Sequence, residues 1–552
     1  MSIVRGYDLL GPLDVELFLA SAAAVTARHQ GLRARLAFTG DGEPALRVLP
    51  PTEPCPLTCQ AVACDSREQF AAYARAMARQ DLQARWDPVA SPLYQLRLLR
   101  RTAEDHILLA TFDHFGFDER AVEIFVRDLW AAYENGGALP GPAGPELAEY
   151  LKRQRARYGR RAATVNAAYW ARLTAGVPPA LQIAAHPHGL GPRLAQRHWF
   201  FRDLDPAATA GLRAACRDAP CSPFEACTAV LGRLAFTLTG QDRLAVYVPT
   251  DSRERHENDV IGNFAAIRML ALDRPEQGGT PAMLAQVRGQ ALRAMAYRHL
   301  SGGTEAELAA GQLRRWGLTT QRQLLVNYFR SVDRGRGWAA SEFALAGLRV
   351  TPVRYAPMTV AFHPSLALYV YDSGDALRAG FYYNCDVLPD AAARRLWDEF
   401  EAELARLPDL LAAAAPSAGP TGEAPGTPAD LAAPELPAGL TPLRAPDGAV
   451  CLHADLAQVR AALLSHPAVT DARVRVVPGP EGGTQVSAAI RADSVLPGQD
   501  ELSGLDGLSG LNELPGLDEL REACLSWPQA TQYTVPPAAI EPLVPTANGA
   551  AS

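Results

Sequence analysis

The chain has 552 residues, of which 48% are apolar and 20% charged, a balance that favours about three or four folded domains at roughly 100–200 residues each. Its net charge of −7 argues against a nucleic-acid-binding surface, and because no apolar run reaches about 18 residues we expect no membrane-spanning helix. The first residues lack the charged head and apolar stretch of a secretory signal, and the nine cysteines show no short paired spacings, so we expect a cytoplasmic protein with reduced thiols.

Residue counts also limit the chemistry. Lys152 is the only lysine, which excludes a mechanism that needs a catalytic lysine elsewhere in the chain. Cys55, Cys59 and Cys64 form the only cysteine cluster, but their spacing differs from the two-residue gap of a zinc knuckle, so we predict no metal ligands there.

Residues 1 to about 412 alternate helical patterns with short apolar strands, which is typical of an α/β (α+β) fold. Asp14 is placed to cap the first helix. In chain order we predict a helix over 13–28, a buried strand over 106–112, an amphipathic helix over 122–133, a buried strand over 244–249 and an amphipathic helix over 390–404.

Composition divides the rest of the chain. Residues 413–440 are rich in Ala, Pro and Gly and predict a linker, because they hold too few large apolar groups to fold alone. Residues 441–552 become globular again and predict a small α+β domain. A low-complexity run with Leu at nearly every third position, about 493–517, predicts a flexible insertion in it.

The most informative segment runs from Phe112 to Glu119, between the predicted strand and helix. A histidine at that point, His114, lies at the end of a sheet, where a neutral imidazole can take a proton near pH 7 and contribute about 10²–10⁴ in rate. Gly116 lets the loop turn tightly. A structural alternative stands beside this one: Asp118 is placed as an ordinary helix N-cap, and Asp113 as a solvated side chain.

This segment resembles the His-His-x-x-x-Asp-Gly motif of condensation domains from nonribosomal peptide synthetases. Further elements of that family occur in the expected order over residues 1–412. They are 28–36 (Arg-His-x-x-Leu-Arg), 168–170 (Tyr-Trp), 251–253 (Asp-Ser-Arg), 261–268 (Ile-Gly-x-Phe), Asn327 with 328–329, and 382–388 (Tyr-x-x-Asp-x-Leu).

The resemblance implies two chloramphenicol-acetyltransferase-like lobes, over 1–185 and 186–412, that meet in a V-shaped pseudodimer. It places His114 in a tunnel between the lobes, where it would orient or deprotonate the attacking amine or alcohol. Asp118 would hold the loop by pairing with Arg253 or Arg268, and the sequence does not choose between these two arginines. Asp113 and Asp118 complete the expected catalytic set, and Gly116, Arg253, Arg268 and Asn327 the supporting set.

Two residues depart from the family motif. Asp113 replaces its first histidine and Glu119 its glycine. The pair Asp113 and Asp118 also fits the Asp-x-x-x-x-Asp motif of heterocyclization domains, although those lack His114 and have a serine where this chain has Ala121. The departures keep two alternatives open: a catalytically inactive scaffold that binds carrier proteins, and a heterocyclization-type domain.

Residues 449–550 resemble the small C-terminal subdomain of adenylate-forming enzymes, through 455–469, 533–537 and 545–550. Thr534 and Ala550 stand where that family has lysines. Because a methyl group cannot neutralise a developing pyrophosphate, we expect a degenerate subdomain without adenylation activity. It would serve in structure or carrier docking, or have no role.

Together these features imply a stand-alone condensation enzyme, an acyltransferase of antibiotic or hybrid natural-product biosynthesis. It would move an acyl group from the phosphopantetheine thioester of an acyl or peptidyl carrier protein to an amine or alcohol acceptor, small or carrier-bound. We expect the chain itself to bind no cofactor or metal, because the partner carries the pantetheine arm.

Overall fold

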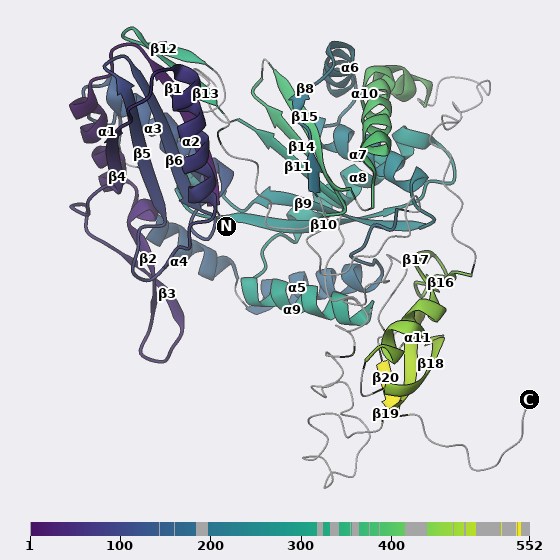
Figure 1. Cartoon of the computed structure of the whole chain (residues 1–552). Coiled ribbons are helices and arrows are strands. Elements are labelled where there is room, and N and C mark those ends of the chain that lie inside the picture. The colour runs from purple at the N-terminus through teal and green to yellow at the C-terminus, as the bar shows by residue number, and fades with distance from the viewer. Residues whose placement is uncertain are drawn as a thin grey trace, which may run out of the picture.

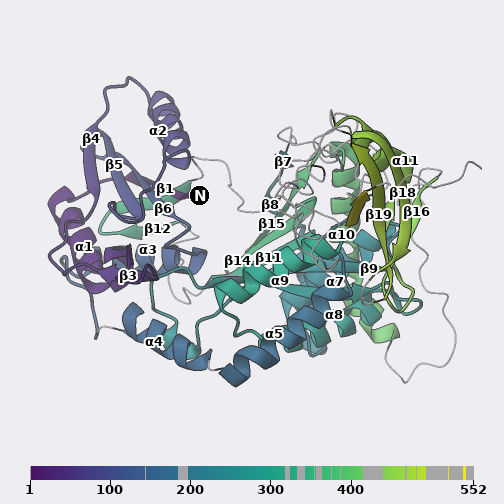
Figure 2. The same ribbon diagram turned by 90° about the horizontal axis from the view of Figure 1, so that it is seen from below.

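The computed structural model describes residues 2–142, 144–158, 160–183, 197–316, 324–331, 342–353, 355, 364–374, 376–385, 387–414, 439–466, 469–479, 482–492, 520, 537 and 539–542. Two lobes lie side by side and meet along one edge, and a smaller C-terminal unit lies against the second lobe (Figures 1 and 2). Both lobes combine helices with a mixed sheet, which confirms the predicted α/β class.

The first lobe is built on a six-stranded sheet in the order β12-β13-β1-β6-β5-β4. Its residues alternate between two apolar layers. Leu108 and Phe112 of β6 face the layer of α1 and α3, whereas Ile107 and Leu109 face the layer of α2. The elements are β1 (Ser2–Leu10), α1 (Val15–Arg28), β4 (Leu57–Ala61), α2 (Arg67–Leu82), β5 (Tyr94–Thr102), β6 (Asp105–Asp113), α3 (Glu119–Glu134), β12 (Phe343–Leu345) and β13 (Leu348–Val353).

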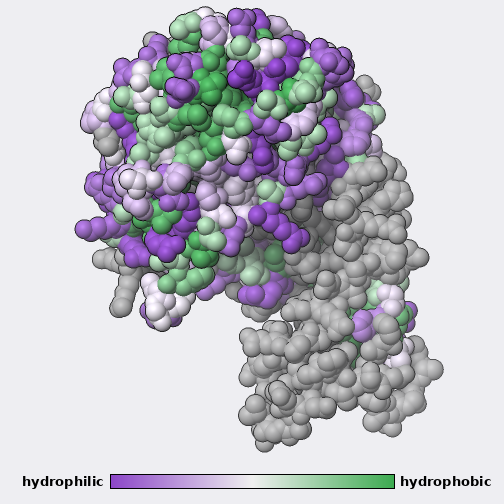
Figure 3. All heavy atoms as spheres, turned by 60° about the vertical axis from the view of Figure 1, so that its left-hand side comes forward, coloured by the Kyte–Doolittle hydropathy of each residue, from purple (hydrophilic) through white to green (hydrophobic). Residues whose placement is uncertain are grey.

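Three predicted elements of this lobe are confirmed. Helix α1 begins after Asp14, whose side chain accepts a hydrogen bond from the Leu17 N–H (2.9 Å). Strand β6 is buried along its whole length, and α3 follows it. A short hairpin of β2 (Ala34–Phe38) and β3 (Pro44–Val48) and the helix α4 (Leu147–Arg157) complete the lobe. Its outer face carries separate hydrophobic patches among hydrophilic residues (Figure 3).

The second lobe is built on a seven-stranded sheet, β10-β9-β11-β14-β15-β7 with β8 paired to β15. Its strands are β7 (Arg197–Trp199), β8 (Arg202–Asp203), β9 (Arg243–Asp251), β10 (Ala265–Asp273), β11 (Leu324–Arg330), β14 (Leu366–Asp372) and β15 (Leu377–Asn384). Its helices are α5 (Arg160–Ala175), α6 (Pro206–Asp218), α7 (Pro223–Thr237), α8 (Gly279–Ala296), α9 (Gly302–Arg315) and α10 (Asp390–Ala413). The predicted strand over 244–249 and the helix that starts at Asp390 are thus confirmed.

The structure differs from the expected lobe boundary at 185/186 in two places. Trp170, Val177 and Ile183 already belong to the core of the second lobe, so the chain crosses over before residue 185. Residues 343–353, predicted in the second lobe, return to the first and add β12 and β13 to its sheet, where β13 pairs antiparallel with β1. Local patterns predict a strand but not the sheet that the strand joins, because pairing depends on residues far away in sequence.

The C-terminal unit contains the hairpin β16 (Thr441–Arg444) and β17 (Val450–Ala454), the helix α11 (Leu456–Leu464) and a sheet of β18 (Val469–Pro478), β19 (Thr484–Ala492) and β20 (Ala539–Pro542). Residues 415–438 of the predicted linker and the predicted insertion over 493–517 lie outside the described residues. Within the described ranges, no helix combines the length and apolar character needed to cross a membrane.

Candidate active site

The loop that carries His114 is shaped by its own backbone and by Asp113. The N–H groups of Gly116 and Phe117 donate to the Asp113 carbonyl oxygen (3.0 and 3.1 Å), and the Phe115 N–H donates to the Asp113 carboxylate (3.3 Å). A Cβ added at Gly116 would lie 3.0 Å from Cδ1 of Leu93, tighter than ordinary packing. Asp113 is buried rather than solvated, and its contacts shape the turn.

Asp118 caps α3 and at the same time joins the two lobes. Its Oδ1 accepts a hydrogen bond from the Ala121 N–H (2.8 Å), the position of an N-cap. The same carboxylate accepts hydrogen bonds from both terminal nitrogens of Arg253: Nη1 donates to Oδ2 (2.8 Å) and Nη2 to Oδ1 (3.0 Å). It also accepts a hydrogen bond from the Phe264 N–H (2.8 Å). The Arg253 side chain has no exposed surface and that of Asp118 is 6% exposed, so this is a buried bidentate pair.

Arg253 is held by its own loop as well. Its Nε donates to the Val260 carbonyl oxygen and its Nη2 to that of Gly262, both at 3.0 Å. The guanidinium lies over the Phe264 ring, 4.3 Å from the centroid. Residues 251–264 therefore form a rigid loop that faces the motif, and Arg253 is its anchor.

His114 is half-buried at this junction. The side-chain amide of Asn263 donates to the His114 carbonyl oxygen (2.5 Å), and the same nitrogen lies 3.4 Å from Nδ1 of the ring. Sequence reasoning missed Asn263, although it lies inside the Ile-Gly-x-Phe element quoted above. Asn263 is visible in the sequence, but it stands at the variable position of that element, so the family motif assigns it no role.

The other supporting residues lie elsewhere. Arg268 is buried and donates hydrogen bonds to Glu305 (2.7 Å) and to the Arg298 carbonyl oxygen (2.6 Å). The arginine that pairs with Asp118 is therefore Arg253 and not Arg268. Burial raises the pKa of Glu305, although Arg268 opposes this. Asn327 lies in β11, opposite Tyr369 of β14, and among the contacts of the described residues none joins it to the motif loop.

Glu119, at the position of the motif glycine, forms an ion pair with Arg5 of β1. Both side chains keep about a third of their surface exposed, at 28% and 30%. The Tyr7 hydroxyl, two residues along the same strand, is buried and has no hydrogen-bond partner among the described residues, and burial raises the pKa of that phenol. The substitution therefore adds a polar group beside the motif that glycine would not supply.

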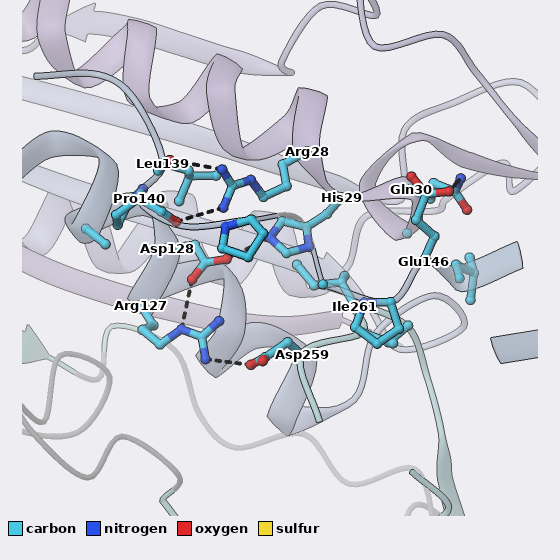
Figure 4. A pocket seen from close by; sticks show the side chains of 17 residues that line it. Arg28, His29, Gln30, Arg127, Asp128, Leu139, Pro140, Glu146, Asp259 and Ile261 are labelled. Atoms are coloured by element: carbon cyan, nitrogen blue, oxygen red, sulfur yellow. Dashed lines mark hydrogen bonds and ion pairs between the residues drawn. The ribbon is translucent and has the colours of Figure 1, made fainter. Parts of the chain in front are cut away.

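The described residues line two cavities at the junction. One of 330 Å³ lies beside the motif loop, which contributes Phe115 and Gly116, and Asn263 lines it from the other lobe. The larger, of 580 Å³, lies between α1, α3 and the loop at Asp259 (Figure 4). In it, Arg127 links Asp128 (2.8 Å) to Asp259 (2.7 Å), and His29 contacts Asp128 (2.7 Å). The His114 side chain lines neither of the two.

In the described part of the chain, no three His, Cys, Asp or Glu side chains gather closely enough to hold a metal ion. The arrangement instead offers one imidazole on a loop fixed by two lobes. Such a group can accept or donate a proton, or orient a nucleophile, at the boundary between them.

The Condensation domain profile matches residues 7–407, which leaves the C-terminal unit outside the match. One of the linear gramicidin synthase proteins of Brevibacillus parabrevis is 25% identical over 414 residues, which cover 72% of this chain and 5% of that protein. The chain thus spans only a small part of this relative's length, and the resemblance of the C-terminal unit to adenylate-forming enzymes stays a prediction.

Solved structures agree with the fold. The condensation domain of the monacolin K polyketide synthase MokA superposes with a TM-score of 0.60 at 17% identity, covering 74% of this chain and 92% of that one. The X-domain from teicoplanin biosynthesis gives 0.59 at 19% identity, covering 73% and 90%. These likenesses confirm the predicted two-lobed fold. With its motif loop and profile match, the chain belongs to the Condensation domain family, whose members in nonribosomal peptide synthetases form amide bonds by acyl transfer.

Proposed function

We propose that this chain transfers an acyl group from a carrier-protein phosphopantetheine thioester to an amine or alcohol, forming an amide or ester in nonribosomal peptide or hybrid natural-product biosynthesis. The observation that carries the proposal is the placement of His114. It follows a fully buried strand and is held at the lobe boundary by Asn263, beside the buried pair of Asp118 and Arg253.

Acyl transfer from a thioester requires the protein mainly to position the acceptor against the thioester carbonyl. The acceptor nitrogen or oxygen attacks the thioester carbonyl carbon, the tetrahedral intermediate collapses, the C–S bond breaks and the thiolate takes up the proton lost by the acceptor. Because the thioester is already activated, a fixed imidazole that orients the acceptor or moves its proton would be the main catalytic group. Asp118, Arg253 and Asn263 would act as positioning residues, and Asp113 as a residue that shapes the loop.

The tautomer of His114 bears on its role. The Asn263 amide faces Nδ1 as a donor, which favours a ring with its proton on Nε2. That form presents an N–H and no free lone pair to the reactants, so it would stabilise the oxygen of the tetrahedral intermediate and orient the acceptor rather than take up the acceptor's proton.

The cavity of 330 Å³ suits the thin, flexible pantetheine arm. Its wall is mainly apolar, from Leu46, Leu93 and Leu151, and Arg155 adds a guanidinium that can meet the phosphate of the arm. We propose this cavity as the route by which a carrier partner delivers its acyl group toward the motif loop.

The test is turnover by the purified full chain. Acyl-loaded carrier protein is incubated with amine and alcohol acceptors, and products are measured by mass spectrometry for wild type, His114→Ala and the control His198→Ala, an exposed histidine of β7 at the edge of the second sheet. We expect product from wild type, a loss of about 10²–10⁴ in His114→Ala, and a change below about twofold in the control. Equal rates for wild type and His114→Ala would rule out the proposed role.

Glu119 and Asp113 favour a second candidate, a scaffold that binds carrier proteins without turnover. Their carboxylates replace the motif glycine and first histidine, and Glu119 is held by Arg5. Tight carrier binding without product from any acceptor would support the scaffold. If wild type forms product and Glu119→Gly forms more of it, the chain is an active enzyme, and Glu119 restricts its active site.

A further inference from the structure

The hairpin β16–β17 packs against the second lobe rather than standing apart from it. Ala180 and Trp316 of that lobe belong to the same apolar cluster as Leu443, Cys451 and Leu452 of the hairpin. All five side chains are at most 6% exposed. The C-terminal unit therefore shares its core with the lobe, and separation would expose apolar surface on both sides.

Two buried glutamines bridge the lobe and β17. The Gln182 side chain donates to the His453 carbonyl oxygen (3.0 Å) and accepts from the His453 N–H (2.7 Å). The Gln241 amide donates to the carbonyl oxygens of Cys451 (2.5 Å) and Ala180 (3.1 Å), and its oxygen accepts from the Gln182 N–H (2.8 Å). Gln241 has no exposed surface and Gln182 is 3% exposed, so water cannot replace these bonds without opening the contact.

The rim adds backbone and ionic contacts. The Asp242 N–H donates to the Val450 carbonyl oxygen (2.7 Å), and the Val450 N–H donates to the Asp242 carboxylate (3.1 Å). Arg243 donates to Asp447 across the contact (2.8 Å). These contacts lie at the start of β9. The hairpin therefore contacts the N-terminal end of the strand, and Arg253 follows its C-terminal end.

We infer that the second lobe carries a built-in docking surface, formed by Ala180, Gln182, Gln241, Asp242 and Trp316, whose permanent occupant is the hairpin of the chain's own C-terminal unit. A domain on a free linker would expose Gln182 and Gln241 to water. Here each is buried and bonded on both sides, and a buried amide left without its hydrogen-bond partners destabilises the fold. The unit is thus a fixed brace of the lobe and not a mobile appendage.

Hydrogen exchange of the intact full chain tests this, with mass spectrometry of peptides from the hairpin and from β9. In wild type we expect hairpin amides as protected as those of β9, because both exchange only when the shared core opens. In Gln241→Ala we expect hairpin exchange at least tenfold faster, whereas the control Gln277→Ala, an exposed glutamine of the same lobe, stays within twofold.

A second variant with a smaller expected effect keeps the test usable if Gln241→Ala fails to fold. Asp447→Ala removes the rim contact to Arg243 and the hydrogen bond that the Asp447 carboxylate accepts from the Ala449 N–H within the hairpin (3.2 Å), and it should speed hairpin exchange about two- to fivefold. Hairpin amides that exchange at open-chain rates in wild type would overturn the inference, as would equal exchange in Gln241→Ala and Gln277→Ala. The readout needs no turnover, so the result stands whether or not the acyl-transfer proposal survives.

Discussion

At the scale of single residues, the site depends on one carboxylate with two tasks. Asp118 caps α3 through Ala121 and pairs with Arg253 across the lobes. The two tasks can be separated, because asparagine caps a helix as well as aspartate does but carries no charge for the arginine.

Asp118→Asn should therefore keep the helix start but lose the buried ion pair. The Arg253 guanidinium would remain buried with Asp251 as its nearest carboxylate (3.1 Å). We expect a loss of about 3 kcal/mol in the free energy of unfolding and a clear loss of turnover. Urea unfolding and the carrier-dependent assay measure the two effects.

Glu305→Gln is the matched control, because it cuts the pair with the buried Arg268 away from the motif. It should lower stability by less and leave turnover within about twofold. If both variants behaved alike in stability and in turnover, the pair at Asp118 would have no special link to the site.

The sequence predicted Asp118 and a partner arginine but did not choose the partner. Arg253 lies in the loop after β9 and Arg268 lies within β10, and both are buried, so burial does not distinguish them. Which one meets Asp118 depends on how the lobes meet, and that information lies in tertiary packing.

At the scale of elements, α3 is the helix that ties the first lobe together. The Asp14 N–H at the start of α1 donates to the Tyr133 hydroxyl near the end of α3 (3.0 Å), and His29 after α1 contacts Asp128 (2.7 Å). Periodicity predicted both helices, because each buries one apolar stripe. It could not predict β12 and β13 in the first sheet, since a strand's partners are set by distant residues.

The contacts of Asp128 with His29 and Arg127 predict that the free energy of unfolding depends on pH. Burial alone would raise the pKa of this carboxyl, but hydrogen bonds from His29 and Arg127 bring the pKa below its usual value. A carboxyl with a lowered folded-state pKa adds stability above its unfolded value, about 3.9, and loses it as the pH falls through the folded value. Wild type should therefore lose stability steeply below about pH 4.

In Asp128→Asn we expect roughly 1–3 kcal/mol less stability at pH 7 and a shallower decline below pH 4, measured by urea unfolding from pH 7 to pH 3. Asp259→Asn removes the other partner of Arg127, a side chain that is 53% exposed, and should cost at most about 1 kcal/mol. Parallel pH profiles for wild type and Asp128→Asn would contradict this assignment.

At the scale of the whole molecule, the lobes meet through short polar contacts and through close approaches of the backbone. Arg157 joins Glu257 (2.9 Å), Arg127 joins Asp259, and Gly31 lies directly against the backbone of Ile261. Family resemblance predicted two lobes in a V, but it did not predict the docked hairpin, because the buried glutamines that bridge it form no recognisable pattern in sequence.

Gly31 makes the lobe contact testable. A Cβ at this position would overlap the Ile261 carbonyl oxygen, which is backbone and cannot turn aside, so Gly31→Ala should push residues 260–262 away. Overpacking of this kind typically costs about 1–3 kcal/mol. Because Gly262 and Asn263 follow directly, the displacement would also reach the contacts of Arg253 and His114.

We therefore expect Gly31→Ala to lower the melting temperature by several degrees and turnover by about tenfold or more. Gly40→Ala is the matched control, since no atom lies within 4 Å of its added Cβ, and it should leave turnover unchanged. A Gly31→Ala enzyme as active as the control would mean that the site tolerates a shifted lobe boundary, and that His114 is positioned by its own loop rather than by the second lobe.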